Sequence, residues 1–300
     1  RNRMDLPQAV SRKGGGISMK KGWKIFWIVC AATAAIGFVC CVIAKVLGVT
    51  TDMIEGRFPH GIGVFSHNYT VDDYINDDDD IPLADDMKNS YSNITEIDVD
   101  IFAGQVKVVL SDDAKDVTVE TRGINKRLGL KCYQDGDELK IKSKERIWHV
   151  NNVGSGTITI TLPRDLKLNE ASFDIGAGTL DIEKIFAQDL YVGVGAGDAN
   201  LTHFEAGEVE FDCGAGSIHA NGDARSEIDI DGGVGEIILT VSGEESSYNY
   251  DIDCGVGEVI CGNTTYSGLA NEKNIDNGAS RDITVDCGVG TITINFGNAL

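Results

Sequence analysis

The fold is decided by a repeat that starts with Ala171-Ser172-Phe173-Asp174-Ile175-Gly176-Ala177-Gly178 and continues to Leu239. Its Gly-x-Gly triplets begin at residues 176, 195, 214 and 233, which is a constant interval of 19 residues. Two further triplets begin at residues 255 and 288, so the last two intervals contain insertions. A fixed short period of this kind is typical of solenoids, in which each repeat forms one coil of a stack.

Apolar and polar residues alternate on both sides of each triplet, which predicts two short strands per repeat with one buried face. The glycines suit a corner at which backbones approach closely and a side chain would clash. The inward position three residues before each triplet is held by Phe173, Val192, Phe211, Ile230, Ile252 and Val285, and the first inward position after it by Leu180, Ala199, Ile218, Ile237, Val259 and Ile292.

The strand pattern begins at Ile94. The segment 97–108 fits the repeat, with Phe102 in place of the first glycine. Strand-like runs follow at 116–121, 128–133, 138–143 and 157–162, separated by polar turns. We therefore expect one domain over residues 94–300, in which an irregular N-terminal β cap covers the first coil.

The N-terminal part predicts a membrane anchor. Residues 1–24 are basic, and Met19-Lys20-Lys21 is typical of a natural start, which would leave residues 1–18 untranslated. Residues 25–48 contain an uncharged apolar run of about the 20 residues that span a bilayer. The basic flank predicts a cytoplasmic N-terminus and an extracellular remainder. A cleaved signal peptide is the alternative. Residues 49–93 are acidic and predict an extended extracellular linker.

Composition excludes some classes of function. The chain has 300 residues and a formal net charge of −21, which argues against nucleic acid as a partner. None of its 8 cysteines forms a C-x-x-C pair, so a zinc site is not expected. Cys213, Cys254 and Cys287 share one inward position of the repeat. They are either small buried hydrophobes or, for Cys254 and Cys287, partners in a disulfide.

The segment Val99-Asp100-Ile101-Phe102-Ala103-Gly104, the segment Ile158-Thr159-Ile160-Thr161-Leu162-Pro163 and the iterated Asp-x-Gly-Ala/Val-Gly units behind one membrane helix resemble the bacterial putative-adhesin family, a domain of unknown function built from β-strand repeats. The likeness covers about residues 94–295. It implies a right-handed parallel β-solenoid on the outer surface of a Gram-positive cell. It supplies no catalytic residues.

One polar row stands out, because an aspartate lies two residues before the triplet in most repeats. In a stack these carboxylates would lie about 5 Å apart. They either accept hydrogen bonds from backbone N–H groups of the glycine corners, as in Asx turns, or hold calcium. The candidate calcium row consists of Asp174, Asp212, Asp231, Asp253 and Asp286.

No metalloprotease, nucleophile-elbow or phosphate-loop motif occurs, so we predict neither an enzyme nor a cofactor. The insertion at residues 262–282 is predicted to be a long polar loop. It is the candidate place for recognition through Tyr266, Asn271 and Asn277, unless it is only a tolerated surface insertion.

The sequence thus predicts a membrane-anchored cell-surface β-solenoid that acts as a non-catalytic binding or structural module of the envelope. Its partner would be a cell-wall glycan or a protein. The first alternative is an accessory sensor of envelope stress that signals to a membrane partner. The second is a carbohydrate-active β-helix enzyme.

Overall fold

The structure is a computed structural model and describes residues 83–143, 156–267 and 271–297. These residues form one all-β unit with two single-turn 3-10 helices, η1 (Lys126–Leu128) and η2 (Glu245–Ser247). The predicted cytoplasmic segment, membrane span and most of the acidic linker lie outside the described residues. Within the described residues, no helix has the length and apolarity needed to cross a membrane.

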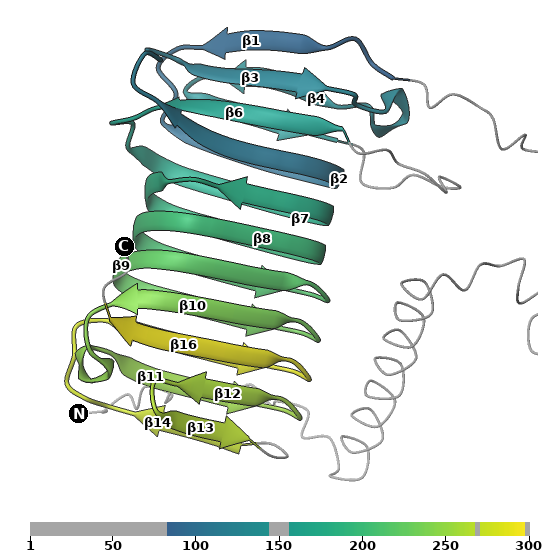
Figure 1. Cartoon of the computed structure of the whole chain (residues 1–300). Helices are drawn as coiled ribbons and strands as arrows, with labels where there is room; N and C mark the ends of the chain where they lie inside the picture. The colour runs from purple at the N-terminus through teal and green to yellow at the C-terminus, as the bar shows by residue number, and fades with distance from the viewer. Residues whose placement is uncertain (1–82, 144–155, 268–270, 298–300) are drawn as a thin grey trace, which may run out of the picture. The chain divides into compact units, whose positions relative to one another are not determined.

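The centre of the unit is a stack of parallel strands (Figure 1), as predicted. It contains β2 (Glu96–Ser111), β7 (Leu168–Ile182), β8 (Ile185–Cys213) and β9 (Ser217–Gly232). Ala171 pairs with Leu190 and Val209 pairs with Ile228, so the register shift between coils equals the interval between glycine triplets. The inward rows predicted from the alternation form the core, and Phe173 and Phe211 are fully buried. Each such side chain contributes about 1.5–3 kcal/mol to folding.

An N-terminal cap covers the first coil, and its four predicted segments are strands. They are β3 (Val117–Arg122), β4 (Lys131–Asp135), β5 (Glu138–Lys142) and β6 (Thr157–Pro163). A fifth strand, β1 (Met87–Tyr91), pairs antiparallel with β3. This strand lies before residue 94, and the alternation in its short polar sequence is too weak to predict it.

The coils do not stack in chain order. After β10 (Glu236–Ser242) the chain forms β11 (Asn249–Cys254) and β12 (Glu258–Cys261), and it ends with β15 (Asp282–Cys287) and β16 (Thr291–Gly297). Yet β15 pairs with both β9 and β11, and β16 pairs with both β10 and β12. The final coil is thus inserted between two earlier ones, as the position of β16 between β10 and β12 shows (Figure 1). Cys254 and Cys287 become register partners, and both are free thiols.

The insertion at residues 262–282 differs from the predicted loop. It contains β13 (Thr264–Ser267) and β14 (Asn271–Ile275), which pair antiparallel with β12 and β11. A solenoid end exposes unpaired backbone groups and an open core, so it needs a cover. The insertion is this cover, and it forms the C-terminal counterpart of the N-terminal cap.

Coil backbones approach most closely at the third residue of each glycine triplet. A Cβ on Gly178, where φ is +145°, would lie 1.8 Å from the carbonyl oxygen of Gly104. A Cβ on Gly216 would lie 2.0 Å from the carbonyl oxygen of Gly197. No real contact is that short, so any side chain here would force neighbouring coils apart.

We therefore expect Gly216→Ala to destabilise the domain by several kcal/mol, comparable to severe overpacking of a core. Gly297→Ala is the matched control, because a Cβ there would meet no atom within 4 Å. Urea unfolding of both variants measures the difference. Equal unfolding midpoints would contradict the close approach of the coils.

Candidate functional site

The strands that precede the glycine corners present a broad acidic face to solvent. In-register stacking aligns their outward residues in rows, such as Glu96 beside Glu170 and Asp212 beside Asp231. We define the acidic face by the carboxylates that occupy these rows on β2, β7, β8, β9, β15 and β11: Glu96, Asp98, Asp100, Glu170, Asp174, Asp189, Glu208, Glu210, Asp212, Glu227, Asp229, Asp231, Asp282, Asp286, Asp251 and Asp253.

The structure brings the candidate calcium residues together on this face, where all five are exposed. Their spatial order is Asp174, Asp212, Asp231, Asp286 and Asp253, with Gly193 between the first two. Partial burial, together with the charges of neighbouring row members, raises the pKa values of Asp174, Asp231 and Asp286. The row therefore carries a cost of like-charge repulsion in its ionised form.

The predicted Asx role of these aspartates differs from what the structure shows. The corner amides donate to the neighbouring coil instead, as Gly214 N–H does to the carbonyl of Val194 and Gly233 N–H to that of Cys213. The corner still belongs to the parallel ladder, so backbone donors and acceptors of successive coils face one another. Among the described residues, no group of three or more His, Cys, Asp or Glu side chains is arranged to hold a metal ion. A calcium role for the row stays a prediction without support from this geometry.

Removing charges from the row should change stability in a pH-dependent way. The raised native pKa values mean that stability is lost as pH rises through them and regained as pH falls toward the unfolded value of about 3.9. We expect Asp231→Asn/Asp286→Asn to unfold at a higher temperature than the parent protein at pH 7, with the gap closing toward about pH 4.

The control variant is Asp113→Asn, which alters an exposed carboxylate outside the acidic face. Repeating the unfolding measurement with added calcium distinguishes like-charge repulsion from calcium binding. A bound cation would stabilise the parent protein and not the double variant. A large calcium-dependent rise confined to the parent protein would contradict the purely repulsive view.

The predicted recognition residues belong to the C-terminal cap. Tyr266 pairs with Val259 and packs, half-buried, against the core, while the backbone of Asn271 pairs with Cys254. The Asn277 amide donates to the carbonyl oxygen of Tyr248 at 2.7 Å. The contacts of Tyr266 and Asn277 hold the cap on the coil formed by β11 and β12. A binding role for the three residues stays a prediction.

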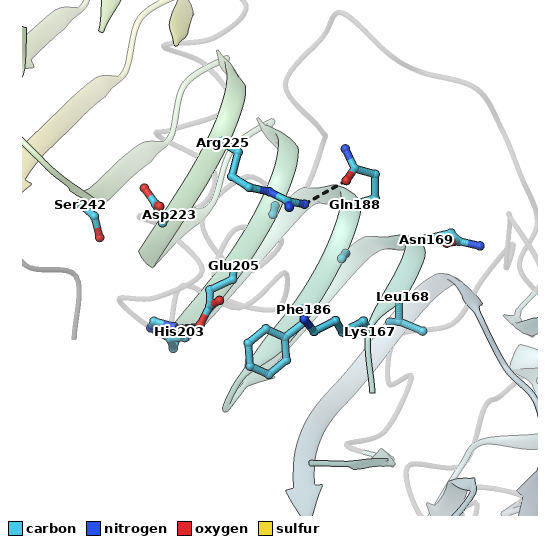
Figure 2. A pocket seen from close by; sticks show the side chains of 12 residues that line it. Lys167, Leu168, Asn169, Phe186, Gln188, His203, Glu205, Asp223, Arg225 and Ser242 are labelled. Carbon is cyan, nitrogen blue, oxygen red and sulfur yellow. Dashed lines mark hydrogen bonds and ion pairs between the residues drawn. The ribbon is translucent and has the colours of Figure 1, made fainter. Parts of the chain in front are cut away.

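A second corner lies half a repeat away from the glycine triplets, and it is lined with different chemistry. Five successive coils contribute to a pocket of about 510 Å³ here, which we call the corner pocket (Figure 2). It is lined by Lys167, Leu168, Asn169, Phe186, Ala187, Gln188, His203, Glu205, Ala206, Asp223, Arg225 and Ser242.

One side of the corner pocket is a charged cluster around Glu205. Its carboxylate lies 3.3 Å from the Lys184 ammonium and 3.2 Å from Nε2 of His203. Partial burial alone would raise the pKa of Glu205, but these two partners lower it overall, so the group stays ionised. The same ammonium lies 4.5 Å from the ring centroid of Phe186 and holds this half-buried ring by a cation–π contact.

The other side is organised by Arg225. Its guanidinium donates to Oε1 of Gln188 at 2.9 Å, the bond drawn in Figure 2. Gln188 can cross the coil between them because that coil has Gly207 there, where a Cβ would lie 2.1 Å from the Gln188 amide nitrogen. Asp223, the register partner of Glu205, pairs with Arg281 at 3.0 Å.

Sequence reasoning missed this pocket, although a signal was present. Between Leu168 and Cys261 the only Lys and Arg residues are Lys184 and Arg225. Their positions in the repeat place both near the midpoint between glycine triplets, and hence at the second corner. The scarcity of basic residues was visible in the sequence, but their convergence required the register.

These features define a class of protein: an all-β repeat domain of parallel coils, capped at both ends, with polar surface sites. Within that class the chain belongs to the Toastrack DUF4097 family, which matches residues 94–266, more than half of the chain. This agrees with the resemblance to putative adhesins of unknown function found in the sequence. No curated protein is similar enough to count as a relative.

Several solved structures are similar to the domain. A putative cell adhesion protein from Clostridium sporogenes is 17% identical, with a TM-score of 0.35, and the match covers 71% of this chain and 99% of that one. A putative adhesin from Bacteroides fragilis is 20% identical, with a TM-score of 0.34 and coverage of 71% and 98%. A putative lipid binding protein from Parabacteroides distasonis is 15% identical, with a TM-score of 0.29 and coverage of 71% and 96%.

Proposed function

We propose that this protein is a non-catalytic binding module of the cell envelope. Residues 25–48 anchor it in the cell membrane with its β domain outside the cell, and its ligand occupies the corner pocket. The observation that carries the proposal is the pocket itself. Successive coils of the stack hold an aromatic ring, amides and charged groups around one open space, which is the usual composition of a ligand site.

The state of the carboxylates favours binding over glycoside hydrolysis. A hydrolytic site needs one carboxyl group whose raised pKa lets it act as an acid. In the corner pocket the pKa of Glu205 is lowered, and Asp223 is held in an ion pair with Arg281. Both groups are suited to accept hydrogen bonds from ligand hydroxyl groups.

Display outside the cell rests on the charge distribution of the N-terminal part. The basic residues before position 25 favour a cytoplasmic N-terminus, and the acidic stretch after position 48 favours an extended spacer. The first described strand begins at Met87, so the spacer would end close to the sheet.

Protease added to intact cells should therefore release a fragment whose new N-terminus lies within residues 50–82, because folded strands resist cleavage and exposed linkers do not. N-terminal sequencing of the released fragment identifies the site. Cleavage that occurs only after cell lysis would contradict the orientation.

Binding is tested with the full-length protein in detergent, sedimented with insoluble cell walls. We expect Phe186→Ala to weaken binding about tenfold, since a ring in a ligand pocket supplies much of its apolar contact. Tyr133→Ala is the matched control, because this exposed aromatic side chain lies on the N-terminal cap. Equal binding by both variants at unchanged unfolding temperature would argue against the corner pocket as the site.

A further inference from the structure

The basic residues of the repeat region converge on one place. Lys184 and Arg225 are the only Lys and Arg between Leu168 and Cys261, and both lie at the corner pocket. Lys167, just before this span, also lines the pocket, and Arg281 reaches it through Asp223. The acidic face of the same coils carries carboxylates instead. The basic residues of this region are therefore gathered at the second corner, away from the acidic face.

The lining of the corner pocket contains two cations, Lys167 and Arg225, and two carboxylates, Glu205 and Asp223, but both carboxylates are paired with cations from outside the lining. Lys184 pairs with Glu205, and Arg281 pairs with Asp223, so both carboxylates of the pocket are neutralised. Lys167 has no ion-pair partner among the described residues. Arg225 is bonded to a neutral amide, that of Gln188. Two cations thus face the pocket without a carboxylate to balance them.

The position of Arg225 suits recognition of a planar or tetrahedral anion. A guanidinium has five N–H donors in a rigid plane. One of those of Arg225 donates to Gln188, which fixes the orientation of the group. Figure 2 shows Arg225 and Gln188 at one end of the pocket, and Phe186 with Lys167 at the other. A ligand in this space would contact the guanidinium of Arg225, the ammonium of Lys167 and the ring of Phe186.

From this arrangement we infer that the corner pocket selects an anionic group, a carboxylate or a phosphate, carried by a polyhydroxylated polymer. The inference rests on the proposed binding function and names its ligand chemistry. Arg225 and Lys167 bind the anionic group, and Phe186 packs against the adjoining carbon skeleton. Asn169 and the two carboxylates take up hydroxyl groups.

Selection must act at short range. The chain carries a formal net charge of −21, which repels polyanions at distances beyond the pocket. Only contacts made inside the pocket, within the reach of Arg225 and Lys167, can reverse that repulsion. The loss of these two charges should therefore reverse the preference for anions and not merely reduce it.

The experiment measures binding of the full-length protein in detergent to three immobilised polymers: polygalacturonate, poly(glycerol phosphate) and neutral dextran. At least one anionic polymer should bind about tenfold more tightly than dextran. Lys167→Gln/Arg225→Gln should reverse this preference, so that dextran binds more tightly than the anionic polymers. Arg122→Gln is the matched control for a lost basic residue, because this exposed side chain lies on β3 of the N-terminal cap and is not part of the pocket lining.

The anionic polymer that binds identifies the source of the charge, carboxylate or phosphate. Dextran binding that equals polyanion binding and depends on Phe186 would overturn the inference and leave the proposed function standing. So would sedimentation of the protein with cell walls when none of the three polymers binds. An equal loss in Arg122→Gln and the double variant would also overturn it. Failure to sediment with cell walls would instead count against the proposed function.

Discussion

The close approach of backbones at the glycine corners is the constraint on which the rest of this structure depends. At Gly178, Gly197 and Gly216 a single added carbon would lie only 1.8–2.0 Å from a carbonyl oxygen of the neighbouring coil, far inside van der Waals contact. The coils can therefore stack only in one register, with corner above corner. Because that register repeats, equivalent residues of successive coils lie side by side and form rows along the stack.

Rows have opposite consequences for apolar and charged residues. Inward rows place Phe173, Phe211 and Ile230 in a continuous dry core, which supplies the stability of the stack. Outward rows place like carboxylates side by side, and partial burial together with these neighbouring charges raises the pKa values of Asp231 and Asp286. At a spacing of about 5 Å in water this repulsion is under about 1 kcal/mol per pair, much less than one buried side chain contributes. The fold thus tolerates its acidic face, which provides no driving force for it.

The sequence predicted the features that depend on local pattern. Alternation identified the inward rows, and the glycine triplets identified the corners. Phe102 was correctly aligned with Gly176, since Ile101 pairs with Ile175 and Ala103 with Ala177. Pattern could not predict spatial order, because the coil with Gly288 pairs equally well beside that of Gly233 or that of Gly255. The strands β13 and β14 of the insertion could not be predicted from its own residues, because they form by covering the coil of β11 and β12 at the end of the stack.

The two corners of each coil have different roles: the glycine corner sets the packing of the coils, and the second corner forms the pocket. At the glycine corner the spacing between coils is so tight that side-chain identity is almost fixed, and the middle residues are only Ala or Val. At the second corner the register of β8 and β9 shifts between Leu201 and Phe204 and again between Ala206 and Glu208. Such irregularities release side chains from their rows, so Phe186, Glu205 and Asp223 can differ although they occupy corresponding places. In-register rows can already contain different residues, as Ser172 beside Tyr191 shows. The shifted register at the second corner also moves neighbouring side chains out of line, and the corner pocket lies at that corner.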